Sequence, residues 1–295
     1  MRNLLILTFL IAEVLVFAQK EKVYDNFAEA NLHRDSVVFL NLRQATFYNL
    51  PEDFGYFPRV EFINLMKNKL DNIDSVFALH NLKEIMARQN NLTLLPPSIG
   101  NLKKLQVLNL SRNQLTELPP EFGGLTSLVN FDISKNKLSF IASEIGKCTE
   151  LEIIVTEYNN LSSLPSEFSY LQNLKTLNLA HNQFRFIPTS VFELESLEEL
   201  NFENNALQSI DTKLGKLTSL KVLIITNNDL RKLPKSINEL KELEVLLVSN
   251  NNLKKLSKYI KNLDNLTTVI ATKNNFSERE IQRIIDSLPS CNVIL

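Results

Sequence analysis

The side chains that could carry acid–base or metal chemistry are few in this sequence and lie far apart along it. The chain has three histidines, His33, His80 and His181, and two cysteines, Cys148 and Cys291. The motifs HExxH, CxxC, GxSxG and GxxxxGKS/T are all absent. The whole chain has only six glycines, which also disfavours a phosphate-binding loop. We therefore expect no catalytic residues, no metal and no cofactor, and we predict that the protein is not an enzyme.

One group of titratable and aromatic side chains recurs at a spacing that could bring its members together. It consists of Glu157, Tyr158, His181 and Glu203, which fall at neighbouring places of the repeat described next. Carboxylates recur throughout that repeat as ordinary solvated surface. We therefore treat this middle set as the weakest of three candidate contact surfaces for a partner.

The elements that would position these residues follow from a repeat of 23 residues. Residues 174–188 read LKTLNLAHNQFRFIP, with apolar side chains at places 1, 4, 6, 11 and 14, Asn at place 9 and Pro at place 15. Neither a 3.6-residue helical period nor strict alternation fits this pattern. Eleven copies align on place 9, spaced 23 residues apart except for one step of 22. The residues at place 9 are Ala45, Asn68, Asn90, Asn113, Asn136, Asn159, Asn182, Asn205, Asn228, Asn251 and Asn274.

Each copy is predicted to form one coil of a solenoid, with a strand around places 3 to 5, a turn at the Asn and a return limb. Places 1, 4, 6 and 11 would point into a narrow core that stacked coils bury together. A buried Asn amide can satisfy turn backbone in its own and the next coil. Ala45 lacks that amide, and we expect a cap to replace it. Pro at place 15 fixes φ and removes a donor, so the return limb should be extended or 3₁₀ helix.

The pattern LxxLxLxxNxLxxLP, as in LQVLNLSRNQLTELP at residues 105–119, resembles the leucine-rich repeat family. The resemblance covers residues 37–276, and the lead-in VYDNFAEANLHRDSVVFLNL is similar to that of secreted bacterial members. It implies an α/β repeat solenoid. This would be a horseshoe with a parallel sheet on its concave face, mostly extended or 3₁₀ convex limbs, and helical caps at both ends. It also implies that partners bind to the concave face.

Four segments are expected along the chain. Residues 1–18 combine Arg2 with an apolar run and small residues before Gln19, which indicates a cleaved signal peptide. Because Glu13 interrupts that run, an uncleaved anchor and no leader at all are the alternatives. Residues 19–36 form an N-terminal cap, residues 37–276 the eleven repeats, and residues 277–295 a C-terminal helical cap with a final strand. At the start of that cap, Ser277 and Glu280 have the spacing of a capping box.

Charge and cysteine positions exclude two further classes. The net charge of −1 lacks the basic excess of a nucleic-acid surface, so no nucleic-acid partner is expected. Cys148 and Cys291 lie six coils apart, roughly 29 Å at about 4.8 Å per coil, whereas a disulfide needs Cα atoms within about 7 Å. Cys148 occupies a place held by Leu in neighbouring coils, so it should be a small buried hydrophobe. We expect no internal disulfide.

Two groups of inner-face residues are candidates for protein binding. Places 3 and 5, mostly polar in the middle coils, become apolar near the C-terminus, and exposed apolar patches often mark partner sites. We call these residues the exit patch: Val222, Ile224, Val245, Leu247 and Ile270. At the other end, aromatic and arginine side chains are typical interface anchors, with Met66 and Met86 beside them. We call these residues the entrance patch: Phe39, Phe62, Arg43 and Arg88. Strand propensity alone would explain the exit patch, and a cap folded over Phe39 and Phe62 would explain the entrance patch.

The sequence thus predicts a non-catalytic protein-binding module that is secreted, periplasmic or on the cell surface. No stable membrane insertion is expected after leader cleavage. The alternative is an intracellular signalling scaffold, because LPPSIGNL at residues 95–102 is similar to the wording of animal leucine-rich repeat proteins of Ras signalling. The partner would be a protein in both cases.

Overall fold

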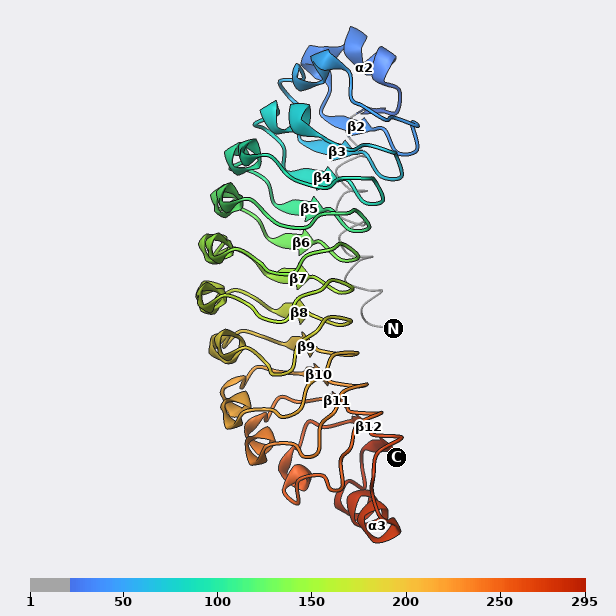
Figure 1. Cartoon of the computed structure of the whole chain (residues 1–295), viewed down its shortest axis with the longest axis vertical. Coiled ribbons are helices and arrows are strands. Elements are labelled where there is room, and N and C mark those ends of the chain that lie inside the picture. The colour runs from blue at the N-terminus through green and yellow to red at the C-terminus, as the bar shows by residue number, and fades with distance from the viewer. Residues whose placement is uncertain (1–21) are drawn as a thin grey trace.

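The computed structural model describes residues 22–295, so the expected signal peptide lies outside the described residues. Within them, thirteen short parallel strands form one sheet in chain order, each hydrogen-bonded only to its neighbours (Figure 1). The strands are β1 Val23–Tyr24, β2 Phe39–Asn41, β3 Phe62–Asn64, β4 Glu84–Met86, β5 Val107–Asn109, β6 Asn130–Asp132, β7 Ile153–Val155, β8 Thr176–Asn178, β9 Glu199–Asn201, β10 Val222–Ile224, β11 Val245–Leu247, β12 Thr268–Ile270 and β13 Asn292–Ile294.

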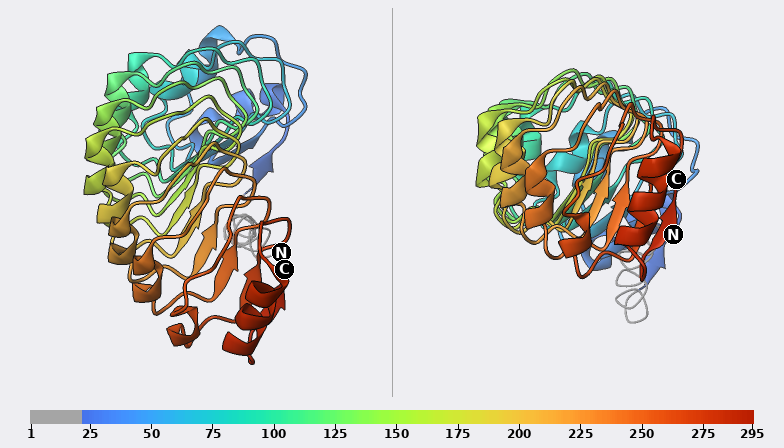
Figure 2. Two further views of the ribbon diagram at one scale, coloured as in Figure 1. Left: turned by 60° about the horizontal axis from the view of Figure 1, so that its bottom comes forward. Right: turned by 90° about the horizontal axis from the view of Figure 1, so that it is seen from below.

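The strands occupy places 3 to 5 of each repeat, as the pattern predicts. In the pairing of β10 with β11, for example, Leu223 lies opposite Leu246, so equal places of successive coils stand side by side. Place 4 is fully buried in both strands. Because side chains alternate along a strand, places 3 and 5 point to the other face. Figure 2 shows that this face lies on the inside of the arc.

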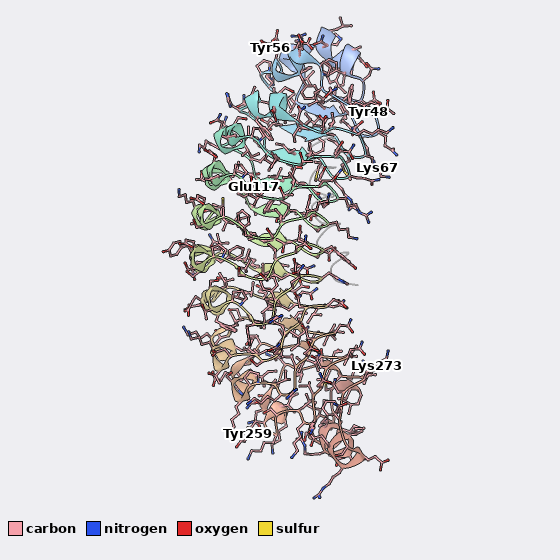
Figure 3. All side chains as sticks on the ribbon, in the orientation of Figure 1. Tyr48, Tyr56, Lys67, Glu117, Tyr259 and Lys273 are labelled. Atoms are coloured by element: carbon pink, nitrogen blue, oxygen red, sulfur yellow. The ribbon has the colours of Figure 1, made fainter. Side chains whose placement is uncertain are left out.

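Three residues after the end of each repeat strand, the residue at place 8 adopts a left-handed backbone. Its φ lies between 50° and 61° in all eleven repeats, although no glycine occupies the place. These residues are Gln44, Lys67, Gln89, Arg112, Lys135, Tyr158, His181, Asn204, Asn227, Asn250 and Lys273. Lys67 and Lys273, labelled in Figure 3, lie along the same edge of the arc. A left-handed conformation is unfavourable for such residues, so other contacts must hold it.

The Asn file at place 9 supplies those contacts. Asn159 Oδ1 accepts a hydrogen bond of 3.0 Å from the Leu138 N–H of the preceding coil. Its Nδ2 donates to the carbonyl of Ile133 in the preceding coil and to that of Thr156 in its own coil. The same three bonds recur from Asn68 to Asn274. The expected role is confirmed, but its direction was wrong, because the amide joins its own coil to the preceding one rather than to the next.

The structure contains short 3₁₀ helices, most of which lie on the outer limbs and begin directly after place 15. They are η1 Arg34–Ser36, η2 Glu52–Gly55, η3 Asp74–Ala78, η4 Pro97–Asn101, η5 Pro120–Gly124, η6 Ser143–Lys147, η7 Ser166–Tyr170, η8 Thr189–Glu193, η9 Thr212–Lys216, η10 Lys235–Glu239 and η11 Ile260–Asn262. Pro165 precedes η7 with φ near −66°, the value that its ring imposes. Buried side chains such as Phe122 and Phe168 close the core beneath these helices. The predicted fold class is confirmed.

The entrance end is covered by α2, Phe27–Leu32, and by β1. Asn26 caps α2 by accepting a hydrogen bond from the Glu29 N–H. Phe27 stacks on Phe54 with ring centroids 5.4 Å apart, which closes that end of the core.

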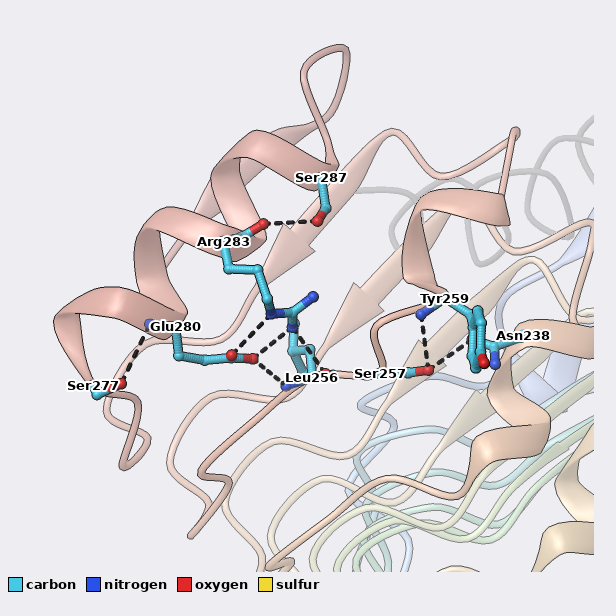
Figure 4. Close-up of polar contacts among 8 residues, drawn as sticks. All are labelled: Asn238, Leu256, Ser257, Tyr259, Ser277, Glu280, Arg283 and Ser287. Carbon is cyan, nitrogen blue, oxygen red and sulfur yellow. Dashed lines mark hydrogen bonds and ion pairs between the residues drawn. The ribbon is translucent and has the colours of Figure 1, made fainter.

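The exit end is covered by α3, Glu278–Ser287, and by β13. Ser277 caps α3 by accepting from the Glu280 N–H. The expected capping box is only half formed, because the Glu280 carboxylate turns to the preceding outer limb. There it accepts hydrogen bonds from the Leu256 N–H and from Arg283, while Arg283 also donates to the Leu256 carbonyl (Figure 4). This arrangement binds α3 to the last full coil.

Both cysteines are free thiols. Cys148 is fully buried, and its Sγ–H donates to the Phe122 carbonyl at 3.6 Å. Burial raises the pKa of the Cys148 thiol to about 12, so the nucleophilic thiolate is scarce at neutral pH. Cys291 is half-buried against the exit end of the core, and burial raises its pKa as well.

Candidate partner-binding face

The exit patch forms a contiguous surface on the concave face. Pairing places Val222 beside Val245, and Ile224 beside Leu247, which in turn lies beside Ile270. All five side chains are half-buried, whereas the residues between them on each strand are fully buried. The structure therefore brings together all five residues of this candidate.

Ile294 extends the exit patch by one more strand. It pairs with Ile270 at the free edge of β13 and is 44% exposed. Sequence reasoning missed Ile294 because β13 follows a helix instead of the 23-residue pattern. Its register was therefore not fixed by counting. The apolar file at place 5 thus runs Ile224, Leu247, Ile270, Ile294.

Backbone donors lie unpaired beside this apolar file. In the middle coils an Asn or Asp at place 5 accepts from the N–H at place 7, as Asn109 does from Ser111 at 3.0 Å and Asp132 from Ser134 at 3.0 Å. An apolar side chain at place 5 cannot accept. Accordingly, in each of the three exit-patch coils the backbone N–H at place 7 has no acceptor within residues 22–295. These three N–H groups belong to Thr226, Ser249 and Thr272. The exit patch combines apolar surface with a row of free donors.

The entrance patch is less open than the sequence suggested. Phe39 is only 8% exposed, because β1 pairs with β2 beside it and the Phe62 ring lies 5.8 Å away, centroid to centroid. Phe62 and Arg88 are half-buried and Arg43 is exposed. Phe39 therefore offers little surface to a partner, while the other three side chains remain accessible.

A groove on the concave face joins the entrance patch to the middle set. It runs along β4 to β9, and its walls include Met86, Arg88, Val107, Ile153 and Glu157. Another wall residue, the Asn130 side chain, has a buried Oδ1 atom with no hydrogen-bond partner among the described residues. An unpaired buried acceptor can be satisfied by a donor from a ligand. No sequence pattern marked this groove, because its wall residues differ in type from coil to coil.

Two members of the middle set, Tyr158 and His181, contact each other. The Tyr158 and His181 rings are stacked, 3.8 Å apart at 10°, and the Lys135 ammonium lies 4.7 Å from the Tyr158 ring centroid. Asn204 contacts the other side of His181 at 3.1 Å. These four residues all occupy place 8, so the stack follows from the repeat. This stack of place-8 side chains forms a polar edge of the sheet.

Residues 22–295 contain no cluster of three or more His, Cys, Asp or Glu side chains arranged to hold a metal ion. The same part of the chain has no helix that is both long and apolar enough to span a membrane.

Comparison with known proteins settles the family. A family model described as "Leucine rich repeat" matches residues 80–138, 149–207 and 172–230. The protein is a leucine-rich repeat protein. No curated protein matches this leucine-rich repeat chain in sequence.

Solved leucine-rich repeat structures resemble it over most of its length. One from Leptospira interrogans is 25% identical with a TM-score of 0.50, covering 93% of this chain and 100% of its own. A TDR receptor structure is 25% identical with a TM-score of 0.78, covering 92% of this chain and 49% of the receptor chain. The plant peptide hormone receptor RGFR1 in complex with RGF2 is 25% identical with a TM-score of 0.52, covering 77% and 46%. This leucine-rich repeat chain thus spans about half of the receptor chains and all of the Leptospira one.

Proposed function

We propose that this leucine-rich repeat protein is a non-catalytic module that binds a protein partner through its concave face, with the exit patch as principal contact. The observation that carries the proposal is the exit patch itself, because apolar side chains and unpaired backbone donors lie together there on an uncovered sheet face. The donors suit the main-chain carbonyls of a bound segment. The resemblance to RGFR1, solved with RGF2, supports a peptide or protein as the ligand class.

The size of the exit patch fits an anchor rather than a complete interface. Because its five predicted side chains are already half-buried, burying their remaining exposed area would contribute at most roughly 5 kcal/mol. Association itself costs roughly 4 to 15 kcal/mol. Further contacts are therefore needed, and the groove with Arg88 and the unpaired Asn130 Oδ1 lies on the same face. We propose that a partner spans both regions.

Substitution of Leu247 by Asp is expected to abolish partner capture. The new carboxylate would lie in the centre of the apolar file, beside Ile224 and Ile270, where binding would strip it of water. The measurement is affinity pull-down with the mature chain, followed by crosslinking and mass spectrometry. Because Leu247 is half-buried on a sheet face rather than in the core, circular dichroism should show a folded solenoid.

The matched control is Leu94→Asp, which makes the same chemical change on an outer limb where the side chain is 56% exposed. It should leave capture unchanged. Capture by Leu247→Asp at the wild-type level would remove the exit patch from the proposal. Equal loss in both variants would show that a general charge effect, rather than the concave face, controls binding.

We also propose that the protein is exported and works in the periplasm, at the cell surface or outside the cell. The support is the apolar run before Gln19, with small residues at its end. N-terminal sequencing of the natural protein is expected to begin near Gln19. An intact Met1 in a soluble cytosolic fraction would instead favour the intracellular scaffold.

A further inference from the structure

Basic residues occupy equivalent places on two neighbouring outer limbs, the limb that follows β10 and the limb that follows β11. The sequences RKLPK at residues 231–235 and KKLSK at residues 254–258 occupy equal places of successive coils. Equal places stack, so each basic side chain of one limb has a basic neighbour on the other. By repeat position the three pairs are Arg231 with Lys254, Lys232 with Lys255, and Lys235 with Lys258. All six side chains are exposed. We call these six residues the cation cluster.

Elsewhere on the solenoid several cations are neutralised by a carboxylate at the equivalent place of the preceding coil. Lys175 pairs with Glu152, Lys221 with Glu198, and Lys216 with Glu193, each at 2.8 Å and each one repeat away. No member of the cation cluster forms an ion pair within the described part of the chain. Like charges stacked at this spacing repel and lower stability. Three such pairs together are therefore unfavourable for the free protein and favourable for an anionic ligand.

Three members of the cation cluster line a hollow. Lys235, Lys255 and Lys258 line it together with Leu233 and Leu256. The carboxylate on its wall, Glu280, is engaged by Arg283 and by the Leu256 N–H, as Figure 4 shows. The hollow thus combines three ammonium groups with the apolar side chains of Leu233 and Leu256, and its carboxylate is already paired with Arg283.

Tyr259 stands at the same hollow and is 42% exposed. A hydrogen bond with Lys258 and the charge of Lys235 lower the pKa of its phenol, which shows that positive charge gathers there. Figure 3 places Tyr259 on the side of the 3₁₀ helices, across the arc from Lys273. The hollow therefore lies away from the concave face.

We propose that the cation cluster is a second docking site, which binds an extended acidic segment of a protein. The ligand must be narrow, because exposed carboxylates flank the limbs at Asp229, Glu239 and Glu278 and would repel a broad anionic surface such as a bilayer. An extended chain laid along one limb would meet cations over about 13 Å, the length of four residue-to-residue steps of about 3.3 Å each. The apolar walls suit the methylene groups of Glu side chains. This site is independent of partner binding by the concave face.

The test measures binding of a fluorescein-labelled oligoglutamate peptide to the full mature chain by fluorescence anisotropy. Replacing Lys235, Lys255 and Lys258 together by Gln is expected to weaken binding at least about tenfold. The same variant should melt about 2 °C higher than wild type, because repulsion is relieved. If the lysines are retained for ligand binding although they lower stability, the variant should show both weaker peptide binding and a higher melting temperature.

The matched control replaces Lys67, Lys137 and Lys147 by Gln, which removes the same charge from exposed, scattered positions. It should change affinity less than about twofold. Equal weakening in both triple variants would overturn the proposal, since net charge alone would explain it. Tighter binding of a sulfated oligosaccharide or of anionic lipid vesicles than of the peptide would also overturn it.

Discussion

Replacing Asn159 by Ala is expected to lower the free energy of unfolding by about 3 to 5 kcal/mol, because it leaves one buried backbone N–H without an acceptor and removes one of the two amide donors from each of two buried carbonyls. The Leu138 N–H loses its acceptor, and the Ile133 and Thr156 carbonyls lose a donor. Asn159 is only 7% exposed, so water cannot replace these bonds without opening the turn. The left-handed residue before it, Tyr158, would also lose its support. Urea unfolding followed by circular dichroism measures the loss.

The next residue in the chain provides the control. Asn160 is exposed, and its side chain only accepts a 3.3 Å hydrogen bond from Gln183. Asn160→Ala should therefore change stability by less than about 0.5 kcal/mol. If the two variants unfold at the same urea concentration, the Asn file does not hold the coils together. The same outcome would remove our explanation of the left-handed turns.

Replacing Arg283 by Ala is expected to cost about 2 to 3 kcal/mol, the second largest effect, because Glu280 would keep a buried charge without its cation. The Glu280 side chain is 8% exposed, whereas that of Arg283 is 33% exposed, which reduces the cost below that of a fully buried pair. The loss should be local first, with α3 and β13 separating from the last coil. Hydrogen exchange of residues 278–294, read by mass spectrometry, is the direct measurement.

The pH dependence of stability gives an independent check on the same pair. The hydrogen bond from Arg283 holds the pKa of the Glu280 carboxyl below its ordinary value. A carboxyl with a lowered folded pKa contributes stability that is present above its unfolded pKa, about 4.3, and is lost as pH falls through the folded value. Wild type should therefore lose stability below about pH 4.3 more steeply than Glu280→Gln.

The control for Arg283→Ala is Arg279→Ala, on the exposed side of α3. It removes the same charge from the same helix without breaking a buried pair, so stability and exchange should stay close to wild type. Fast exchange of α3 in both variants would indicate that the loss of a positive charge from the helix, rather than of the ion pair, is the cause.

Periodicity was sufficient to predict most of the fold. A buried residue at place 4, such as Leu223, and an amide at place 9, such as Asn159, have roles that depend only on equivalent places standing side by side. Counting residues yields that adjacency directly. The same counting predicts that Val222 stands beside Val245 on the candidate site, and the strand register confirms it.

The hydrogen-bond partner of a side chain was harder to predict than its position in the sheet. Asn109 and Asp132 looked like a solvent-facing polar surface, but they fold back onto the backbone N–H two residues later. That choice depends on the turn geometry created by the left-handed residue at place 8, which no sequence signal marked because Lys, Tyr, His and Asn all occupy it. The burial of Phe39 and the exposure of Ile294 could not be deduced from the repeat, because β1 and β13 lie outside it.

Because the step between coils is uniform, the length of the solenoid increases by the same amount with each coil. Bonds of the Asn file reach only from one coil to the next, so each added or deleted coil would shift the exit patch relative to the entrance patch by one increment of about 4.8 Å. Duplication of one coil during evolution could therefore lengthen the distance between the exit patch and the entrance patch without changing the residues of either patch. The number of coils in such a protein would then be set by the length of a partner that contacts both patches.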